Sequence, residues 1–348
     1  MKLPPWPYFD EDEIKIVSDI LRSGKVNYWT GSEGSLFEND FSSWCGTNHS
    51  IAMANGSLAL YSIYKAIGLG PGDELITTPR TFIATSSCAL LLGADVVFAD
   101  VDENSGCITS ETIIPLITSR TKAISVVHLA GWPANILPIQ KLAKEFGLYL
   151  IEDCAQAHGA TIEVDGEKKS VGSFGDASAW SFCQDKILST AGEGGMVATN
   201  NKELFDYLWS LKDHGKTIDS VFNTNHPSGF RWLHEKIGSN FRLTELQSAI
   251  GRIQLSKLPE WTKLRTRNAN ILVETLRDLN AIRVPLPIEG FNHAWYKFYC
   301  FIDPLSFTDG WNRDRIVAEI NNEGFPAYHG GCSEIYLEKC FKNKLNDK

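Results

Sequence analysis

Short apolar runs alternate with stretches of helical periodicity along the first 200 residues. The segments ELITTP, DVVFADV, KAISVVHL and LYLIEDC have the length of buried strands, and the stretches that end near Leu92, Ile117 and Phe146 have helical spacing. Strands separated by helices of this length form right-handed βαβ units, because parallel strands need a crossover connection. The pattern predicts an α/β layer sandwich with a mostly parallel sheet.

Helical patterns also flank this region. An acidic first turn followed by apolar positions predicts an amphipathic helix over residues 10–21, and a second helix follows the loop KVNYWTGSEG at residues 36–44. Downstream, helical spacing covers residues 203–213 and 243–279, separated by TIDSVFNTNHPSGFRW, which we expect to be an extended loop. The strand-like AWYKFYCFI and a helix over residues 314–322 then predict a small α+β domain.

Length, composition and charge narrow the class of protein. A chain of 348 residues is about twice a typical domain, which fits a large domain over residues 1–250 and a small domain over residues 251–348. A net charge of −9 provides no basic field for nucleic acid or an anionic membrane. The sequence shows neither a long apolar run nor a secretory signal in MKLPPWPYFDEDEIK, so we expect a cytoplasmic protein.

The cysteines show no metal-site or disulfide pattern. None of them forms a CxxC pair or a Cys/His spacing typical of zinc. We therefore expect no metal and reduced, mostly buried thiols at the eight positions Cys45, Cys88, Cys107, Cys154, Cys183, Cys300, Cys332 and Cys340.

Two segments carry candidate binding groups. In ANGSLAL, Gly56 and Ser57 begin a helix whose free N–H groups favour an anion such as phosphate, although an N-cap at Ser57 is the alternative. In IEDCAQAHGA, Asp153 ends a strand at the edge where ligands bind. It can pair with a protonated heterocyclic nitrogen, or it can be a capping or salt-bridging residue. His158 alone is more typical of a hydrogen-bonded structural histidine.

Lys186 lies in SFCQDKILSTAGEGG, between the strand-like AWSF and a glycine-rich turn that leads into GGMVAT. A sheltered lysine can lose its proton and form a Schiff base, because desolvation disfavours a charged amine. A solvated surface charge is the alternative and describes most lysines. The order of a phosphate-type helix start, an aromatic in TFIAT, an aspartate at a strand end and this lysine favours the Schiff base.

Taken together, these segments resemble the pyridoxal 5'-phosphate-dependent sugar aminotransferases of fold type I, the DegT/DnrJ/StrS family. The resemblance implies an aspartate-aminotransferase-like fold with a mostly parallel seven-stranded sheet between helices, followed by a small C-terminal α+β domain. It covers nearly the whole chain, through PWPYFDEDEI, WTGSEG, PGDELI, TFIAT, FADVD, HLAGWPANI, IEDCAQAHGA, GSFGDASAWSF, KILSTAGEGG, KDHGK, GSNFRLTELQSAI and GCSEIYLEK.

The resemblance also implies roles for individual residues. Lys186 becomes the Schiff-base lysine, and Asp153 becomes the partner of the pyridinium nitrogen. Phe82 matches the aromatic position that stacks on the cofactor ring, and Gln156 matches the position beside its phenolic side. Phosphate-binding positions match Gly56, Ser57, Ser181 and, through the partner subunit of a homodimer, Asn240, for which a simple turn or N-cap role is the alternative.

By the same resemblance, the chain transfers an amino group from glutamate to a nucleotide-linked keto sugar, and the cofactor cycles through pyridoxamine 5'-phosphate. The keto group lies at C3 or C4 of a sugar, often deoxy, destined for cell-surface polysaccharides or secondary metabolites. The freed amine of Lys186 moves the proton. Residues in or beside regions where the family contacts its sugar are Asn27, Tyr28, Trp29, His214, Arg231 and His329, although Trp29 is equally typical of a core aromatic.

Two other functions stay open. One is a sugar 3-dehydratase, which keeps the cofactor but has histidine in place of the lysine, so Lys186 argues against it. The other is a non-catalytic regulatory homologue, since a fold of this type can be kept after its catalytic activity is lost. Family chains continue past GCSEIYLEK with a strand and a closing helix, whereas this sequence stops at FKNKLNDK, so we also expect a small domain that is incomplete.

Overall fold

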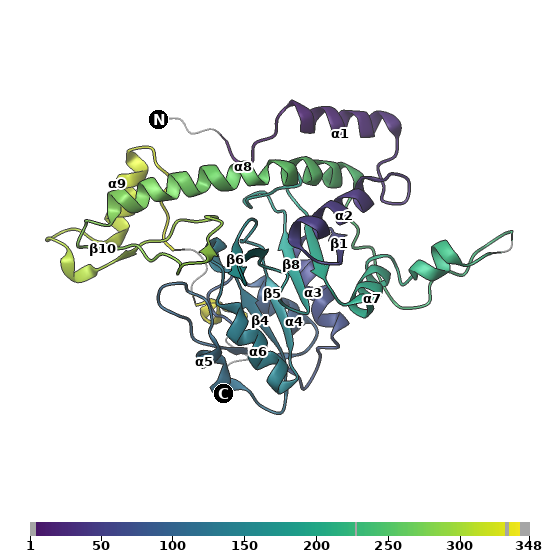
Figure 1. Ribbon diagram of the computed structural model, residues 1–348, viewed down its shortest axis with the longest axis horizontal. Helices are drawn as coiled ribbons and strands as arrows, with labels where there is room; N and C mark the ends of the chain where they lie inside the picture. Colours follow the sequence, from purple (N-terminus) through teal and green to yellow (C-terminus); the bar gives the residue numbers. More distant parts are fainter. Residues whose placement is uncertain (1–4, 227, 331–333, 342–348) are drawn as a thin grey trace.

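A central sheet organises the computed structural model, which describes residues 5–226, 228–330 and 334–341 (Figure 1). The sheet has seven strands: β1 (His49–Met53), β2 (Glu74–Thr77), β3 (Asp95–Phe98), β4 (Thr121–Val127), β5 (Tyr149–Asp153), β8 (Ala177–Ser181) and β9 (Gly195–Thr199). Their order is β1-β9-β8-β5-β4-β2-β3. Neighbours from β8 to β3 pair in parallel, whereas β9 is antiparallel to β8 and β1. The expected mostly parallel sheet is confirmed.

Helices connect and cover these strands, and each helix expected from the periodicity is present. Several begin at a capping residue; α8, for example, begins after Thr244, whose side chain accepts a bond from Gln247 in a capping box. The α-helices are α1 (Glu11–Ser23), α2 (Glu33–Cys45), α3 (Gly56–Ala66), α4 (Ala84–Leu91), α5 (Ser110–Ile113), α6 (Ile136–Phe146), α7 (Lys202–Lys212), α8 (Glu245–Leu276) and α9 (Arg313–Asn322).

The sheet separates two hydrophobic cores. Because side chains alternate along a strand, Leu150 and Ile151 of β5 point to opposite faces and belong to different cores. One core is closed by α2, α6 and the first half of α8, and the other by α3, α4 and α7. This three-layer arrangement leaves the carboxyl ends of the parallel strands at one edge, where α3 and α4 begin.

The C-terminal part differs from the expectation in one element. The strand expected over residues 294–302 is reduced to β12 (Phe301–Ile302), which pairs with β10 (Ile282–Arg283). Trp295 has φ of 54°, and Ala294 and Lys297 donate instead to the carbonyls of Gly131 and Ala130 at 2.8 and 3.2 Å. The backbone here is therefore bound to the loop after β4, which is incompatible with a continuous strand.

The predicted domain boundary falls inside α8, which runs unbroken through residue 250. The helix packs on the large core at its N-terminal half and reaches the C-terminal elements at its far end (Figure 1). A third, small sheet has the order β11-β6-β7 and joins β11 (Phe291–Asn292) to β6 (Thr161–Val164) and β7 (Glu167–Ser170). The division at residue 250 thus stays a prediction.

The segment between α7 and α8 extends from the body of the molecule, as expected for a loop, apart from one π-helical turn, η3 (Asp219–Asn223) (Figure 1). Its apolar side chains are largely exposed: Phe230 is 78%, Trp232 86% and Ile237 93% accessible. Exposed apolar side chains gathered on one segment are typical of a surface that contacts another molecule.

The cysteine expectation agrees with the described residues. The free thiols are buried at Cys45, Cys88, Cys107 and Cys154, half-buried at Cys183, and exposed at Cys300 and Cys340. Cys332 lies outside the described residues. Within the described part of the chain, no helix has the length and apolar character needed to cross a bilayer.

Candidate active site

Asp153 ends β5 at the carboxyl edge of the sheet and is almost fully buried. The hydroxyl of Thr85 donates to Oδ2 at 2.7 Å, and the N–H of Ala155 donates to Oδ1 at 3.1 Å. Burial raises the pKa of Asp153, although both hydrogen bonds and the positive charge of Lys186 act to lower it. A cation placed against this carboxylate would therefore stabilise its ionised form.

Lys186 occupies the turn between β8 and β9, and its side chain is only 14% exposed. Its Nζ lies 3.3 Å from the hydroxyl oxygen of Tyr296 and 3.5 Å from Oδ2 of Asp185. The hydroxyl of Tyr296 in turn donates to Asp185. The surface-charge alternative does not describe this lysine, because its amine is sheltered and held by two neighbouring groups.

The N-terminal segment and α8 hold the backbone around Lys186. The indole N–H of Trp6 donates to the carbonyl of Lys186 at 3.0 Å. The side-chain oxygen of Gln254, which is buried in α8, accepts from the N–H of Ser189 at 3.3 Å. The same Gln254 amide donates to the carbonyl of Tyr8 at 3.2 Å. The lysine-bearing turn is thus fixed at both ends by segments distant in sequence.

The N-terminus of α3 lies beside the end of β8. Asn55, not Ser57, caps the helix, because its side chain accepts from the N–H of Leu58 at 2.9 Å; the capping alternative for Ser57 is therefore wrong. The N–H groups of Gly56 and Ser57 have no intrahelical acceptor, as in the first turn of any helix. A Cβ on Gly56 would lie 2.7 Å from Cβ of Ser181, so only glycine allows this close approach.

Phe82 and Gln156 border the same edge. Phe82 precedes α4 and is 61% exposed, although two residues from it Ala84 is buried. Gln156 is buried, and its Oε1 accepts from the N–H of Ala130 at 2.7 Å. The turn after β4 thereby supports the turn after β5. Phe82 lies three residues before Thr85, which is in the first turn of α4 and contacts Asp153.

Asn240 forms a turn just before α8. Its Oδ1 accepts from the N–H of Arg242 at 3.3 Å, and its backbone bridges to Asp213. Buried Asp213 also accepts from the Arg242 guanidinium at 2.6 Å. Within this chain Asn240 has the role of a turn residue, which was the alternative. The contact of Asn240 with a cofactor phosphate across a subunit interface stays a prediction.

The aromatic residues predicted to contact the sugar are packed. Tyr28 donates to Glu38 at 2.9 Å and lies under the amine of buried Lys212, which is 4.1 Å from the ring centroid. Trp29 meets Trp209 edge to face at 6.0 Å, in agreement with the core alternative. Exposed Asn27 accepts from the Trp29 N–H at 3.1 Å and stabilises the turn.

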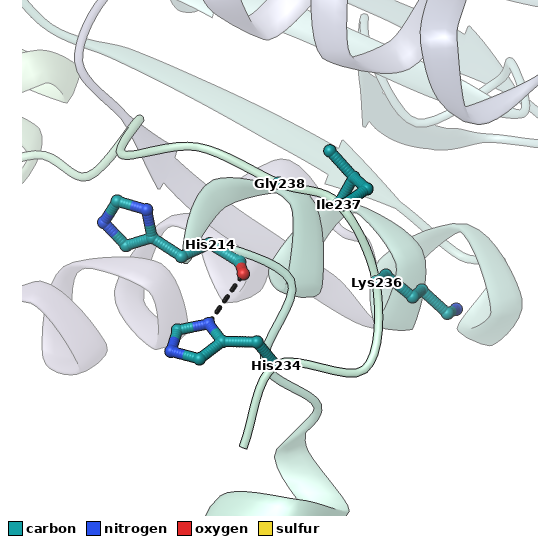
Figure 2. A pocket seen from close by; sticks show the side chains of 5 residues that line it. All are labelled: His214, His234, Lys236, Ile237 and Gly238. Carbon is teal, nitrogen blue, oxygen red and sulfur yellow. Dashed lines mark hydrogen bonds between the residues drawn. The ribbon is translucent and has the colours of Figure 1, made fainter. Parts of the chain in front are cut away.

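The polar substrate candidates lie on separate surfaces. His214 lines an open depression of about 540 Å³ with His234, Lys236, Ile237 and Gly238. Nδ1 of His234 bonds to the carbonyl of His214 at 2.8 Å, and Figure 2 shows both imidazoles on one side of the loop, with Lys236 pointing away. Arg231 is exposed on the extended segment, and His329 lies 3.3 Å from Asp314 on α9. Within the described residues, no bond joins these side chains to Lys186.

Two buried histidines near the sheet edge behave differently. His128 accepts from the N–H of Ala134 at Nδ1, so its Nε2 carries the proton and donates to Glu152 at 2.9 Å. Glu152 also accepts hydrogen bonds from three backbone N–H groups of residues 172–175. The His128–Glu152 pair therefore has a structural role. His158 has no hydrogen-bond partner at either ring nitrogen among the described residues, and burial lowers its pKa to about 3. The prediction of a hydrogen-bonded His158 is therefore wrong for the described residues.

Sequence reasoning missed three groups around the candidate residues. Asp185 was detectable because it precedes Lys186, and Thr85 because it lies in TFIAT. Tyr296 gave no local signal, because it follows Lys186 by 110 positions and lies in a segment that looks like a strand.

Comparisons with known proteins agree with this arrangement. Residues 7–345 match the model of the DegT/DnrJ/EryC1/StrS aminotransferase family. A UDP-N-acetyl-3-dehydro-alpha-D-glucosamine 3-aminotransferase of Acidithiobacillus ferrooxidans is 39% identical over 302 residues, which is 87% of this chain and 75% of that protein.

Solved structures agree as well. The structure of an aminotransferase from Psychrobacter cryohalolentis is 47% identical, with a TM-score of 0.95 over 99% of this chain and 88% of that one. PseC of Helicobacter pylori, an aminotransferase involved in the biosynthesis of pseudoaminic acid, is 29% identical, with a TM-score of 0.87 over 99% and 88%. The fold is that of the fold type I aminotransferases, and the chain belongs to the DegT/DnrJ/EryC1/StrS aminotransferase family.

Proposed function

We propose that this aminotransferase uses pyridoxal 5'-phosphate to move an amino group from glutamate to a nucleotide-linked keto sugar. The observation that carries the proposal is that the charge of Lys186 acts on buried Asp153 at the end of β5, while the α3 N-terminus packs on the end of the neighbouring strand β8. The relatives named as sugar-nucleotide or pseudoaminic acid pathway aminotransferases support the substrate class.

The residues present fit the cofactor. Its phosphate is an anion, and the first-turn N–H groups of Gly56 and Ser57, beside Ser181, suit an anion at a helix N-terminus. Its ring nitrogen would face Asp153, and its aldehyde carbon would bond to Lys186. Phe82 supplies an exposed aromatic face of the kind that stacks on a planar ring, and Gln156 supplies an amide for its phenolic side.

When bound, the cofactor supplies an electron sink for the carbanion formed at the amino donor. Asp153 would stabilise a positive charge on the ring nitrogen, because a buried carboxylate and an adjacent cation stabilise each other's ionised forms. The amine of Lys186, once released, takes a proton at Nζ and returns it, as a general acid and base. Thr85 and Ala155 orient Asp153 through their hydrogen bonds to the two carboxylate oxygens.

A homodimer with shared sites completes the proposal. Asn240 of the partner subunit would bind the phosphate, and the exposed apolar side chains of the segment between α7 and α8 support an interface there. Asn27, Tyr28, Trp29, His214, Arg231 and His329 are retained as proposed sugar contacts.

Trapping the cofactor tests the proposal. We expect that borohydride reduction of the chain mixed with pyridoxal 5'-phosphate will fix the cofactor on Lys186, as read by peptide mass spectrometry. Prior addition of glutamate should abolish the trapping, because the lysine is then released. Asp153→Asn serves as the matched variant: it should still be trapped but respond far more slowly to glutamate, since the ring nitrogen loses its counter-charge.

Two results would contradict the proposal or separate it from its alternatives. Adducts on other lysines only would exclude a role for Lys186. Trapping that no amino donor prevents would favour the non-catalytic homologue. If glutamate works, nucleotide-linked 3-keto and 4-keto sugars can be screened for their ability to restore trapping, which identifies the acceptor.

A further inference from the structure

Two groups, Tyr296 and Asp185, meet at the amine of Lys186, and neither is assigned a role above. The hydroxyl oxygen of Tyr296 is 3.3 Å from Nζ, and the ring centroid of Tyr296 is 5.0 Å from it. Asp185 closes the triangle, because it accepts from the Tyr296 hydroxyl and lies 3.5 Å from Nζ. Among the described residues, Asp185 is the carboxylate within ion-pair distance of this amine.

The direction of these hydrogen bonds follows from the chemistry of the groups. A carboxylate only accepts, so the single hydroxyl hydrogen of Tyr296 points at Asp185. The phenol oxygen accepts an N–H of Lys186 through a lone pair. Burial would raise the pKa of Asp185, but the hydrogen bond from Tyr296 and the charge of Lys186 lower it overall, which favours the ionised acceptor.

Tyr296 is held in place independently of the lysine. Ala294 and Lys297 donate to the carbonyls of Gly131 and Ala130, and the guanidinium of Arg265 donates to the carbonyl of Trp295 at 3.1 Å. A Cβ on Gly131 would lie 3.1 Å from the backbone nitrogen of Tyr296, so the two loops are in close contact. The hydroxyl is therefore preorganised by the turn after β4 and by α8.

We propose that Tyr296, oriented by Asp185, is a further catalytic residue that holds the amine of Lys186 whenever this amine is not bonded to the cofactor. The inference rests on the proposed function, in which Lys186 is released in each half-reaction and must then reach the reacting carbon as an acid and base. The hydroxyl of Tyr296 accepts an N–H of Lys186, and no covalent bond of the tyrosine breaks. The amine is thus kept in one position through the cycle, in place of several rotamers.

Labelling of the cofactor-free chain tests the inference without using activity. Trace acetic anhydride modifies the neutral amine, and mass spectrometry compares Lys186 with exposed Lys168 in the same sample. In Tyr296→Phe we expect Lys186 to react about two- to tenfold faster, the value of one lost hydrogen bond. Asp185→Asn should act in the same direction, because it removes the charge and disorders the hydroxyl without opening space.

The matched control is Tyr336→Phe, which removes a similar hydroxyl that donates to Glu334 on the surface. It should leave Lys186 labelling unchanged. In the loaded enzyme, Tyr296→Phe should lower kcat with glutamate about two- to tenfold at little change in KM, since the hydroxyl acts on the released lysine and not on donor binding.

Unchanged labelling of Lys186 in both Tyr296→Phe and Asp185→Asn would overturn the inference, provided that both variants unfold thermally as wild type does. That result is distinguishable from failure of the proposed function, because borohydride trapping on Lys186 in the wild-type chain is measured separately. If Tyr296→Phe alone reacts faster and Asp185→Asn does not, the phenol only shields the amine, and the inference is likewise wrong.

Discussion

The ionised carboxylate of Asp153 is stabilised by the hydroxyl of Thr85. Thr85 has one hydroxyl hydrogen, and because the carboxylate can only accept, this hydrogen goes to Asp153. Thr81, 2.8 Å away, must then donate to Thr85, so the carboxylate lies at the end of a short relay of hydroxyls. The relay offsets part of the unfavourable burial of the charge.

Replacing Thr85 with valine removes the hydroxyl at similar volume. We expect a loss of about 1.5–3 kcal/mol in the interaction with the ionised carboxylate. The folded-state pKa of Asp153 is already raised by burial, so the cofactor-free chain should lose stability as pH rises from the ordinary carboxyl value to the raised one. In Thr85→Val this loss of stability should be larger and should extend to higher pH.

Urea unfolding as a function of pH measures this effect, and Thr85→Ser is the control because it keeps the hydroxyl. Cofactor affinity should fall in Thr85→Val and be restored in Thr85→Ser. An identical pH dependence in the two variants would show that the hydroxyl does not influence Asp153.

At the scale of elements, the site depends on how closely α3 approaches β8. Gly56 allows the contact with Ser181, and Gly195 of β9 allows a second one, because a Cβ there would lie 2.5 Å from the backbone of Asn55. The two glycines bring the helix N-terminus onto the strand ends. The dipole and the free N–H groups of α3 are thereby directed at the same edge as Asp153.

We expect Gly56→Ala to displace the N-terminus of α3, because the new Cβ would lie 2.7 Å from Cβ of Ser181. Overpacking of this kind costs about 1–3 kcal/mol of folding free energy. The affinity for pyridoxal 5'-phosphate, followed by fluorescence titration, should fall by more than the loss of stability explains. In the control Gly70→Ala the nearest atom would be at 3.8 Å, so both quantities should match wild type.

At the scale of the whole molecule, the proposed site takes one residue, Asn240, from a second chain. Asn240 makes a turn hydrogen bond within its own subunit, and the segment before it carries exposed apolar side chains. In a two-fold dimer the same surface is used by both subunits, so each would complete the other's site.

Co-expression of Lys186→Ala with Asn240→Ala tests this arrangement. Each variant alone should be nearly inactive. A heterodimer has one site with both native residues, so a random mixture should recover about a quarter of wild-type activity by two-fold symmetry. Activity no higher than the average of the two variants would show that Asn240 serves the site of its own chain, or none.

The local pattern of the sequence determined most of the fold. Helices and parallel strands were predictable because amphipathic period and strand length are local properties, and every helix expected between residues 10 and 322 is present. The segment 294–302 was not predictable, since its backbone bonds go to the loop after β4 and not to a neighbouring strand.

For the site, the sequence by itself predicted roles for Lys186, Asp153 and the α3 N-terminus, because an ordered set of motifs marks them. Only the tertiary structure decided which groups surround them. Tyr296, Trp6 and Gln254 reach Lys186 or its turn from more than 60 positions away, and no periodicity records such contacts. Local spacing encodes elements, whereas the environment of a reactive amine is created by packing between elements distant in the chain.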